Sequence, residues 1–147
     1  MDLGTIGSIL SFALKLEKEI DDFYNRHISS IRNTSLKHAL EEIQKAQRKR
    51  ERVLSRFRRE NVTEMILESI HGFSSHEYEL GIASEDHQDD SSLQASAIRI
   101  EENLQLFFLN ASEKTSFLPE VSDQLKRFSD GAGKNVMLLK SVRFSST

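Results

Sequence analysis

Four long segments of the chain repeat apolar residues at alternating spacings of four and three, which is the pattern of an amphipathic α-helix. Helix breakers are scarce, because the 147 residues include one proline and six glycines. No segment shows the alternation of β-branched and aromatic residues that is typical of strands. We therefore expect an all-α fold, an antiparallel four-helix bundle whose helices span residues 5–31, 35–61, 91–112 and 116–142.

Each segment has one face that we expect to point into the core. In chain order these faces comprise Ile6, Leu10, Ala13, Glu17, Ile20, Tyr24 and His27; Leu36, Leu40, Ile43, Gln47, Arg50, Leu54 and Phe57; Ala97, Glu101, Leu104 and Phe108; and Val121, Leu125, Phe128, Ala132, Asn135, Leu139 and Val142. Gln47 and Arg50 fall in the middle of an otherwise apolar face. This is the most informative irregularity of the sequence.

Residues 62–90 lack the periodicity and predict a long crossover between two helix pairs rather than a second domain. A short helix could form near the start of the crossover, from Met65, Ile66, Leu67 and Ile70, and end at His71-Gly72. The remainder, residues 74–92, is acidic and polar.

Two local signals concern helix ends. Ser91 and Gln94 have the spacing of a capping box at the start of the third helix. In the fourth segment, Gly131 and Gly133 indicate either a close approach between helices or a break near Asp130. The sequence leaves these two alternatives open.

The composition excludes several classes of protein. There is no cysteine, so disulfides and thiolate metal sites are excluded. No apolar run approaches the roughly 20 residues that span a bilayer, and the first residues lack the basic start of a signal peptide. We expect one domain over residues 1–147, located in the cytoplasm and without a membrane partner. The net charge of −3 gives no general reason to expect nucleic acid.

Two stretches of the chain match each other at an offset of 84 residues, residues 12–24 against residues 96–108. Paired positions include Glu17 with Glu101, Ile20 with Leu104, Phe23 with Phe107, and Tyr24 with Phe108. Such a repeat indicates two helix pairs that are related by pseudo-symmetry.

In these residues the chain resembles the rubrerythrin-like branch of the ferritin-like superfamily. The first and third helices of that family each carry a glutamate, often seven residues before an aromatic, as Glu17 and Tyr24 or Glu101 and Phe108 do here. Its second and fourth helices each carry Glu-x-x-His, and the resulting four carboxylates and two imidazoles hold two irons. The resemblance implies a ferritin-like bundle and makes a homodimer plausible. We interpret both aromatics as core residues rather than as parts of a redox site.

The sequence departs from the family at both Glu-x-x-His positions. The corresponding pairs are Gln47 and Arg50, and then Ala132 and Asn135, or Gly131 and Lys134 if the register slips by one residue. Glutamine is a poor replacement for a bridging carboxylate, and arginine cannot bind a cation. Transferring the family's ligand positions to this sequence leaves only Glu17 and Glu101, as vestigial metal ligands. We therefore expect no cofactor, with iron or another divalent metal as the alternative.

Two buried carboxylates without a metal need a cation at the same level of the core. We therefore expect a buried polar network in which Arg50 points inward and pairs with Glu17, Glu101 or both. Gln47 or Asn135 would complete the hydrogen bonds. The alternative is that Glu17 and Arg50 lie at the edge of the helix face and reach water.

The second segment also carries a basic run from Lys45 to Arg59. Most of its cations lie on the outward part of the predicted helix, without interleaved aromatics. A solvated face, which could pair with the acidic crossover, is favoured over a phosphate-binding surface, and we do not expect nucleic acid as a partner. His71, His76 and His87 lie among acidic residues but match no ligand motif, so we expect an exposed loop there.

No catalytic constellation is complete, since Ser/His/Asp and Gly-rich phosphate signatures are missing. We therefore expect a protein that has lost di-iron chemistry and acts as a non-catalytic structural or interaction module. One alternative is a residual metalloprotein that handles iron, peroxide or oxygen, in which Asp130 or a crossover histidine joins Glu17 and Glu101. A second alternative is a nucleic-acid binder that uses the basic helix.

Overall fold

The computed structural model describes residues 2–60, 70–81 and 89–144. It contains four α-helices, α1 (Ile6–Ile28), α2 (Thr34–Glu60), α3 (Asp90–Lys114) and α4 (Pro119–Ser141), and a short 3-10 helix, η2 (Ser75–Tyr78). The described residues form no strand, apart from one isolated bridge between Asp2 and Ser74. The predicted all-α class is therefore confirmed, and the largest shifts in helix bounds are the end of α1 at Ile28 and the start of α4 at Pro119.

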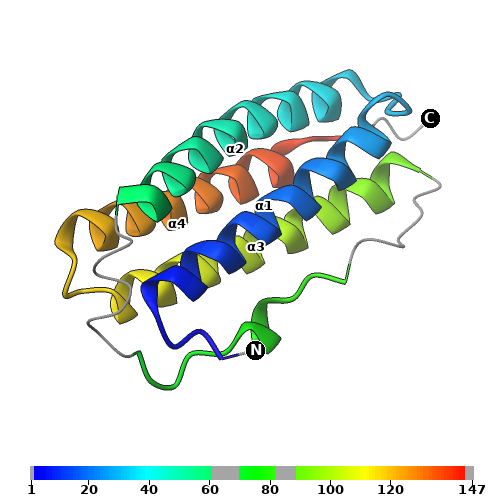
Figure 1. Ribbon diagram of the computed structural model, residues 1–147. Helices are drawn as coiled ribbons and strands as arrows, with labels where there is room; N and C mark the ends of the chain where they lie inside the picture. Colours follow the sequence, from blue (N-terminus) through cyan, green and yellow to red (C-terminus); the bar gives the residue numbers. More distant parts are fainter. Residues whose placement is uncertain (1, 61–69, 82–88, 145–147) are drawn as a thin grey trace.

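The four helices pack side by side as a bundle (Figure 1). α1 and α4 run in one direction and α2 and α3 in the other, so that α1 pairs with α2 and α3 pairs with α4 as antiparallel hairpins (Figure 1). Because α2 ends at the opposite end of the bundle from the start of α3, the connection between the hairpins must travel the length of the molecule. Along the described residues, no helix combines the length and the apolar character needed to cross a membrane.

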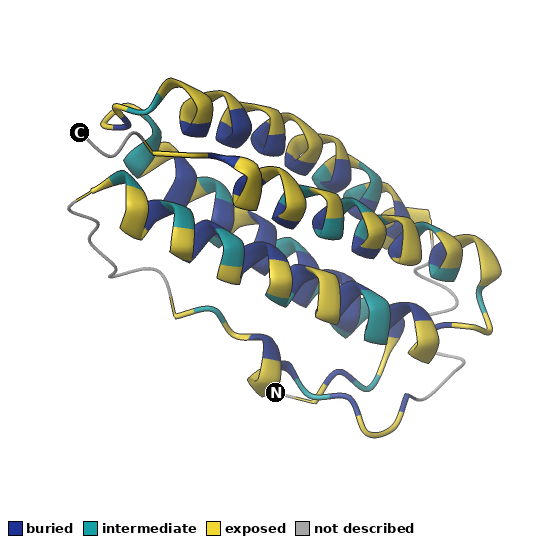
Figure 2. Cartoon of the chain, turned by 180° about the vertical axis from the view of Figure 1, so that it is seen from behind, coloured by how far each residue is buried: buried dark blue, intermediate teal, exposed yellow. Residues whose placement is uncertain are grey.

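The inner faces of the helices form one hydrophobic core, and the outer faces are exposed (Figure 2). The predicted apolar positions of α1, α2 and α3 are buried, and on α4 Phe128 is half-buried and packs against the core. Complete burial of one large apolar side chain, such as that of leucine, isoleucine or phenylalanine, stabilises a fold by about 1.5–3 kcal/mol. The core is therefore the main source of stability, and any polar group within it needs a partner.

The helix starts follow the chemistry of their first residues. Thr5 and Ser8 form a reciprocal capping box at α1, and Asn33 Oδ1 accepts from the Leu36 amide at 2.9 Å in the first turn of α2. At α3 the predicted capping box of Ser91 and Gln94 is wrong. Asp89 caps the helix by accepting from the Ser92 amide at 2.7 Å.

The Gln94 side chain has a different role. Its Nε2 donates to the carbonyl oxygens of Leu139 at 2.7 Å and Val142 at 3.2 Å. Carbonyl groups at a helix C-terminus lack partners within the helix. Gln94 therefore closes the last turn of α4 and ties it to α3.

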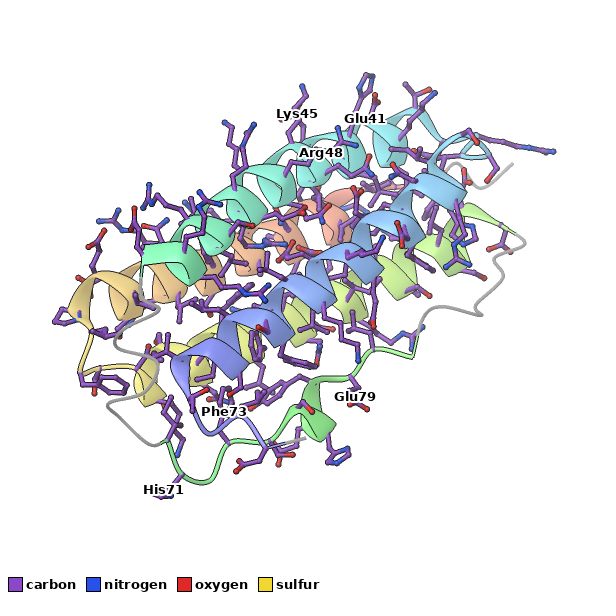
Figure 3. The ribbon with its side chains drawn as sticks, viewed as in Figure 1. Glu41, Lys45, Arg48, His71, Phe73 and Glu79 are labelled. Atoms are coloured by element: carbon purple, nitrogen blue, oxygen red, sulfur yellow. The ribbon has the colours of Figure 1, made fainter. Side chains whose placement is uncertain are left out.

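The described part of the crossover, residues 70–81, packs on the α1–α3 side of the bundle (Figure 1). Phe73 lies beneath α1 and α3 (Figure 3) and stacks on Phe107 with ring centroids 5.8 Å apart. Tyr78 meets the same ring edge-on at 5.3 Å, and its hydroxyl accepts from Asn110 Nδ2 at 2.7 Å. The exposed positions expected for His71 and His76 are confirmed, but Phe73, Ser75 and Tyr78 in the same segment are buried. Of the short helix proposed from Met65, Ile66, Leu67 and Ile70, the first three residues lie outside the described residues. Ile70 is not helical, and Gly72 has a positive φ of 72° in a bend.

At the end of the bundle where α3 begins, the carboxylate of Asp90 links segments that connect the helices. Asp90 accepts hydrogen bonds from the backbone amides of Arg32 at 3.0 Å and Asn33 at 2.7 Å. Asn33 Nδ2 in turn donates to the Arg143 carbonyl at 3.0 Å. The α1–α2 connection, the start of α3 and the segment after α4 are thereby linked.

α4 is continuous through Gly131 and Gly133, so the alternative of a break near Asp130 is wrong. A Cβ atom at position 133 would lie 2.8 Å from Gln105 Nε2, whereas a Cβ atom at position 131 would meet nothing within 4 Å. Gly133 therefore permits a close approach of α3 and α4, and Gly131 faces open space.

We expect Gly131→Ala to stabilise the protein by about 0.5–1 kcal/mol, because alanine loses less backbone entropy in a helix and the site has room for a methyl group. Gly133→Ala is the matched variant, and its gain should be smaller because the Gln105 amide must move. Urea unfolding of both variants, with unchanged dependence on denaturant, measures the difference. A larger gain from Gly133→Ala than from Gly131→Ala would contradict this account of the two glycines.

Candidate functional site

An ion pair between α1 and α2 lies in the centre of the bundle. Arg50 Nε donates to Glu17 Oε1 at 2.6 Å, and Arg50 Nη2 donates to Glu17 Oε2 at 3.0 Å. The side chain of Glu17 is 0% exposed and that of Arg50 is 5% exposed. Two parallel hydrogen bonds of this kind fix the guanidinium and the carboxylate in one plane and are stronger than bonds between neutral groups.

Arg50 has two further electrostatic neighbours on α3. Its guanidinium lies over the ring of Phe108, 5.4 Å from the centroid, where the π-electron face attracts a cation. The negative charges of Glu17 and Glu101 also act on it. Burial acts to lower the pKa of Arg50, but these charges and the hydrogen bonds to Glu17 outweigh it, and the pKa is raised. The guanidinium therefore stays protonated in the core.

Gln47 lies one helical turn before Arg50 on α2 and faces the same level of α1. Its Nε2 donates to the backbone carbonyl of Glu17 at 2.7 Å. Gln47 Oε1 is buried and accepts no hydrogen bond from any described group. The amide thus binds the backbone of α1 at the residue whose side chain holds Arg50.

Glu101 on α3 is the second buried carboxylate, with 0% exposure. It accepts from the Tyr24 hydroxyl on α1 at 3.0 Å and from Asn135 Nδ2 on α4 at 2.9 Å. These contacts decide the register of α4, because Ala132 is fully buried and Asn135 reaches the site. The alternative register, with Gly131 and Lys134 inward, is wrong.

Burial raises the pKa of Glu101 above its ordinary value of 4.5, against the opposing effects of the Arg50 charge and the Asn135 hydrogen bond. Burial likewise raises the pKa of Glu17, against the charge and hydrogen bonds of Arg50. The Tyr24 hydroxyl is buried beside Glu101, and both effects raise its pKa well above 10.0. The phenol is therefore a hydrogen-bond donor to Glu101 at neutral pH.

The structure brings together all five residues expected in the buried network, namely Glu17, Gln47, Arg50, Glu101 and Asn135. Arg50 forms its hydrogen bonds with Glu17, and Glu101 is bound by Tyr24 and Asn135 instead. The alternative of an edge position is wrong, since Glu17 is completely buried. Sequence reasoning placed Tyr24 in the core but missed its hydrogen bond; its position seven residues after Glu17 was the available signal.

These residues do not fit a di-metal centre. In residues 2–60, 70–81 and 89–144, no group of three or more His, Cys, Asp or Glu side chains could hold a metal ion. The cation Arg50 occupies both oxygens of Glu17, and a metal at that carboxylate would meet the guanidinium charge. Asp130, His71 and His76, the further ligands considered from the sequence, are exposed away from the core, and His87 lies outside the described residues.

The basic side chains of α2 other than Arg50 are exposed, and Lys45 points away from the bundle (Figure 3). Arg48 lies 3.9 Å from Asp21 on α1, while Lys45 and Arg56 pair with Glu42 and Glu60 on their own helix. The predicted solvated face is confirmed. The acidic residues 82–88 of the crossover, with which this face could pair, lie outside the described residues.

No protein family, no curated protein and no solved structure matches the chain. The fold and site define a four-helix bundle with a buried Arg–Glu pair between α1 and α2 and a second buried glutamate that is bound from α1 and α4.

We expect Arg50→Ala to destabilise the protein by about 3–5 kcal/mol, because it leaves two buried carboxylates without their cation. Arg52→Ala, at an exposed position on the same helix, should change the free energy of unfolding by less than about 0.5 kcal/mol. The double variant Glu17→Met/Arg50→Met removes both charges and should be more stable than Arg50→Ala. Chemical unfolding tests the series, and a rise in stability for Arg50→Ala alone would exclude the ion pair as the reason for this arginine.

We expect the stability of Glu101→Gln relative to the unmodified protein to increase as the pH rises above 4.5, the ordinary pKa of glutamate. The raised pKa means that the folded state binds a proton at Glu101 more tightly than the unfolded chain does. Stability from this proton is fully present below the unfolded pKa and is lost as the pH rises through the folded pKa. Glutamine cannot ionise, so the variant escapes the loss. Unfolding midpoints at several pH values test this, with the exposed Glu102→Gln as the charge-matched control; parallel pH profiles for both variants would refute it.

Proposed function

We propose that this protein is a ferritin-like helical bundle that has exchanged its metal centre for an internal ion-pair network and acts as a non-catalytic structural or interaction module. The proposal rests on one observation, the double hydrogen bond between the Arg50 guanidinium and the Glu17 carboxylate at 0% exposure. The fixed positive charge of the Arg50 guanidinium balances the negative charge of this carboxylate, as a metal cation would in a di-iron protein.

The directions of the helices and the level of the polar residues support the proposed relationship. A ferritin-like bundle carries its ligands inward from all four helices at one level. Here Glu17, Arg50, Glu101 and Asn135 come from α1, α2, α3 and α4, respectively. Glu17 and Arg50 form one hydrogen-bonded pair, Glu101 forms a second set with Tyr24 and Asn135, and the charge of Arg50 acts on both carboxylates. The two hairpins and the long crossover agree with the same comparison (Figure 1).

The site also supports a non-catalytic role. Its ionisable groups are bound to each other, and the side chains of Glu17 and Glu101 are completely buried. A general acid or base must reach the proton that it transfers in a bound substrate. The two sets of buried hydrogen bonds, one between α1 and α2 and one joining α1, α3 and α4, instead fix which residues of the helices face one another.

In the proposed role the protein interacts with its partners through the outer surface of the bundle. Self-association as a dimer is its expected form, and Met137, with 73% of its surface exposed, is the position on α4 most suited to such a contact. Location in the cytoplasm stays a prediction of the sequence. The exposed cations of α2 offer a second route, binding of nucleic acid, but their contacts with Asp21, Glu42 and Glu60 reduce the charge available to phosphates.

We expect protein purified without chelator to contain well under one metal ion per chain, and an anaerobic titration to reveal no tight Fe(II) site. The physical reason is the charge of Arg50 beside the carboxylates. Elemental analysis and equilibrium dialysis measure the stoichiometry, and light scattering of the same sample measures its mass.

The double substitution Gln47→Glu/Arg50→His provides a positive control, because it restores the Glu-x-x-His spacing on α2 next to Glu17 and Glu101. It should bind a divalent metal more tightly than the unmodified chain. Near two tightly bound irons per unmodified chain would overturn the proposed function.

A further inference from the structure

A groove of about 380 Å³ opens between α2 and α4. One face of α2 and one face of α4 line the groove. The lining includes Ala46 and Val53 on α2 and Phe128 and Gly131 on α4, and each pair has the spacing of residues on one helix face. These four residues give it an apolar floor. The ring of Phe128 also contacts the core, where it meets the ring of Phe108 edge-on with the two centroids 5.4 Å apart.

The groove lies on the side of the bundle that the described crossover does not cover. On the opposite side, between α1 and α3, Phe73 and Tyr78 of the crossover pack on the helices. Between α2 and α4 the chain has the small residues Ala46 and Gly131, and a Cβ atom at position 131 would meet nothing within 4 Å. The sequence therefore leaves space here that an ordinary bundle fills with a side chain.

The lining of the groove carries positive charge and no carboxylate. Lys49, Arg127 and Lys134 are exposed and line it, and Arg50 borders it from inside the core. Among the described residues, no acidic group lies within 4.0 Å of the three exposed cations. Acidic residues do occur nearby on α4, but they form no part of the lining. A low-dielectric floor beneath like charges raises the local concentration of anions.

We propose that this groove binds a small amphipathic carboxylate with an unbranched acyl chain. The apolar floor fits the chain, and Lys49, Arg127 and Lys134 fit its carboxylate. The volume lies within the range of small-molecule sites, about 300–1,000 Å³. The phosphate backbone of a nucleic acid would use the cations but leave the apolar floor without a partner, so the fatty-acid-like ligand is favoured. This inference goes beyond the proposed function and does not depend on the loss of a metal.

Titration of the full chain with monomeric dodecanoate, followed by calorimetry, tests the groove. Saturable binding of one molecule per chain is the expected result. Gly131→Leu should weaken it at least about tenfold, because the new side chain would occupy the groove, and a Cβ atom at this position meets nothing within 4 Å. Lys126→Leu is the matched control, since it adds the same side chain to an exposed position of α4 outside the lining, and it should bind as the unmodified chain does. Circular dichroism of both variants verifies that the helices remain folded.

The charge requirement has separate tests. Lys134→Gln and Lys49→Gln should each weaken dodecanoate binding about 2–5-fold, as expected for loss of one exposed attraction. Dodecanol should bind more weakly than dodecanoate, and added salt should reduce the difference. Equal binding of the alcohol and the acid, unchanged affinity in Gly131→Leu, or binding of anionic phosphatidylglycerol vesicles without binding of monomeric dodecanoate would each overturn the proposal.

Discussion

The guanidinium of Arg50 and the carboxylate of Glu17 lie where the four helices meet, and both are removed from water. A charge in such a place is tolerated when its partner is fixed, so the pair constrains how α1 and α2 can slide or rotate against each other. Phe108 beneath the guanidinium extends the constraint to α3, and the link through Glu101 to Asn135 extends it to α4. Hydrophobic burial supplies most of the stability, but it would tolerate several registers. The polar network selects one of them.

The internal repeat shows at which position the two halves of the network differ. Tyr24 and Phe108 occupy equivalent positions in the two matching stretches, as do Glu17 and Glu101. The Tyr24 hydroxyl crosses to Glu101, whereas Phe108 has no hydroxyl to offer Glu17 and presents its ring to Arg50 instead. One carboxylate is therefore bound by a cation and the other by two neutral donors. A single positive charge, that of Arg50, therefore serves two pseudo-equivalent glutamates. The difference depends on the hydroxyl oxygen of Tyr24 in α1, which Phe108 in α3 lacks.

The sequence was sufficient for the helices and for the level of the polar residues, because periodicity and the cost of an unpaired buried charge both act locally. It could not decide whether Arg50 binds Glu17 or Glu101, since the choice depends on distances across the bundle. Phe73 and Tyr78 were missed because they lie in an aperiodic, acidic segment and are buried by contact with distant Phe107. The start of α3 was misplaced because Asp89 and Ser91 are both good capping residues, and geometry favours the first.

The carboxylate of Asp90 has a mechanical consequence for the end of the bundle. A short connection between helices ordinarily opens by itself, and its amide hydrogens exchange with solvent far faster than those of the core. The amides of Arg32 and Asn33 are instead held by the first turn of α3, and Asn33 also holds the chain after α4. Opening this connection thus requires fraying at two other places. The loop shares the cooperativity of the helices that it joins, and it behaves as part of the folded unit rather than as a hinge.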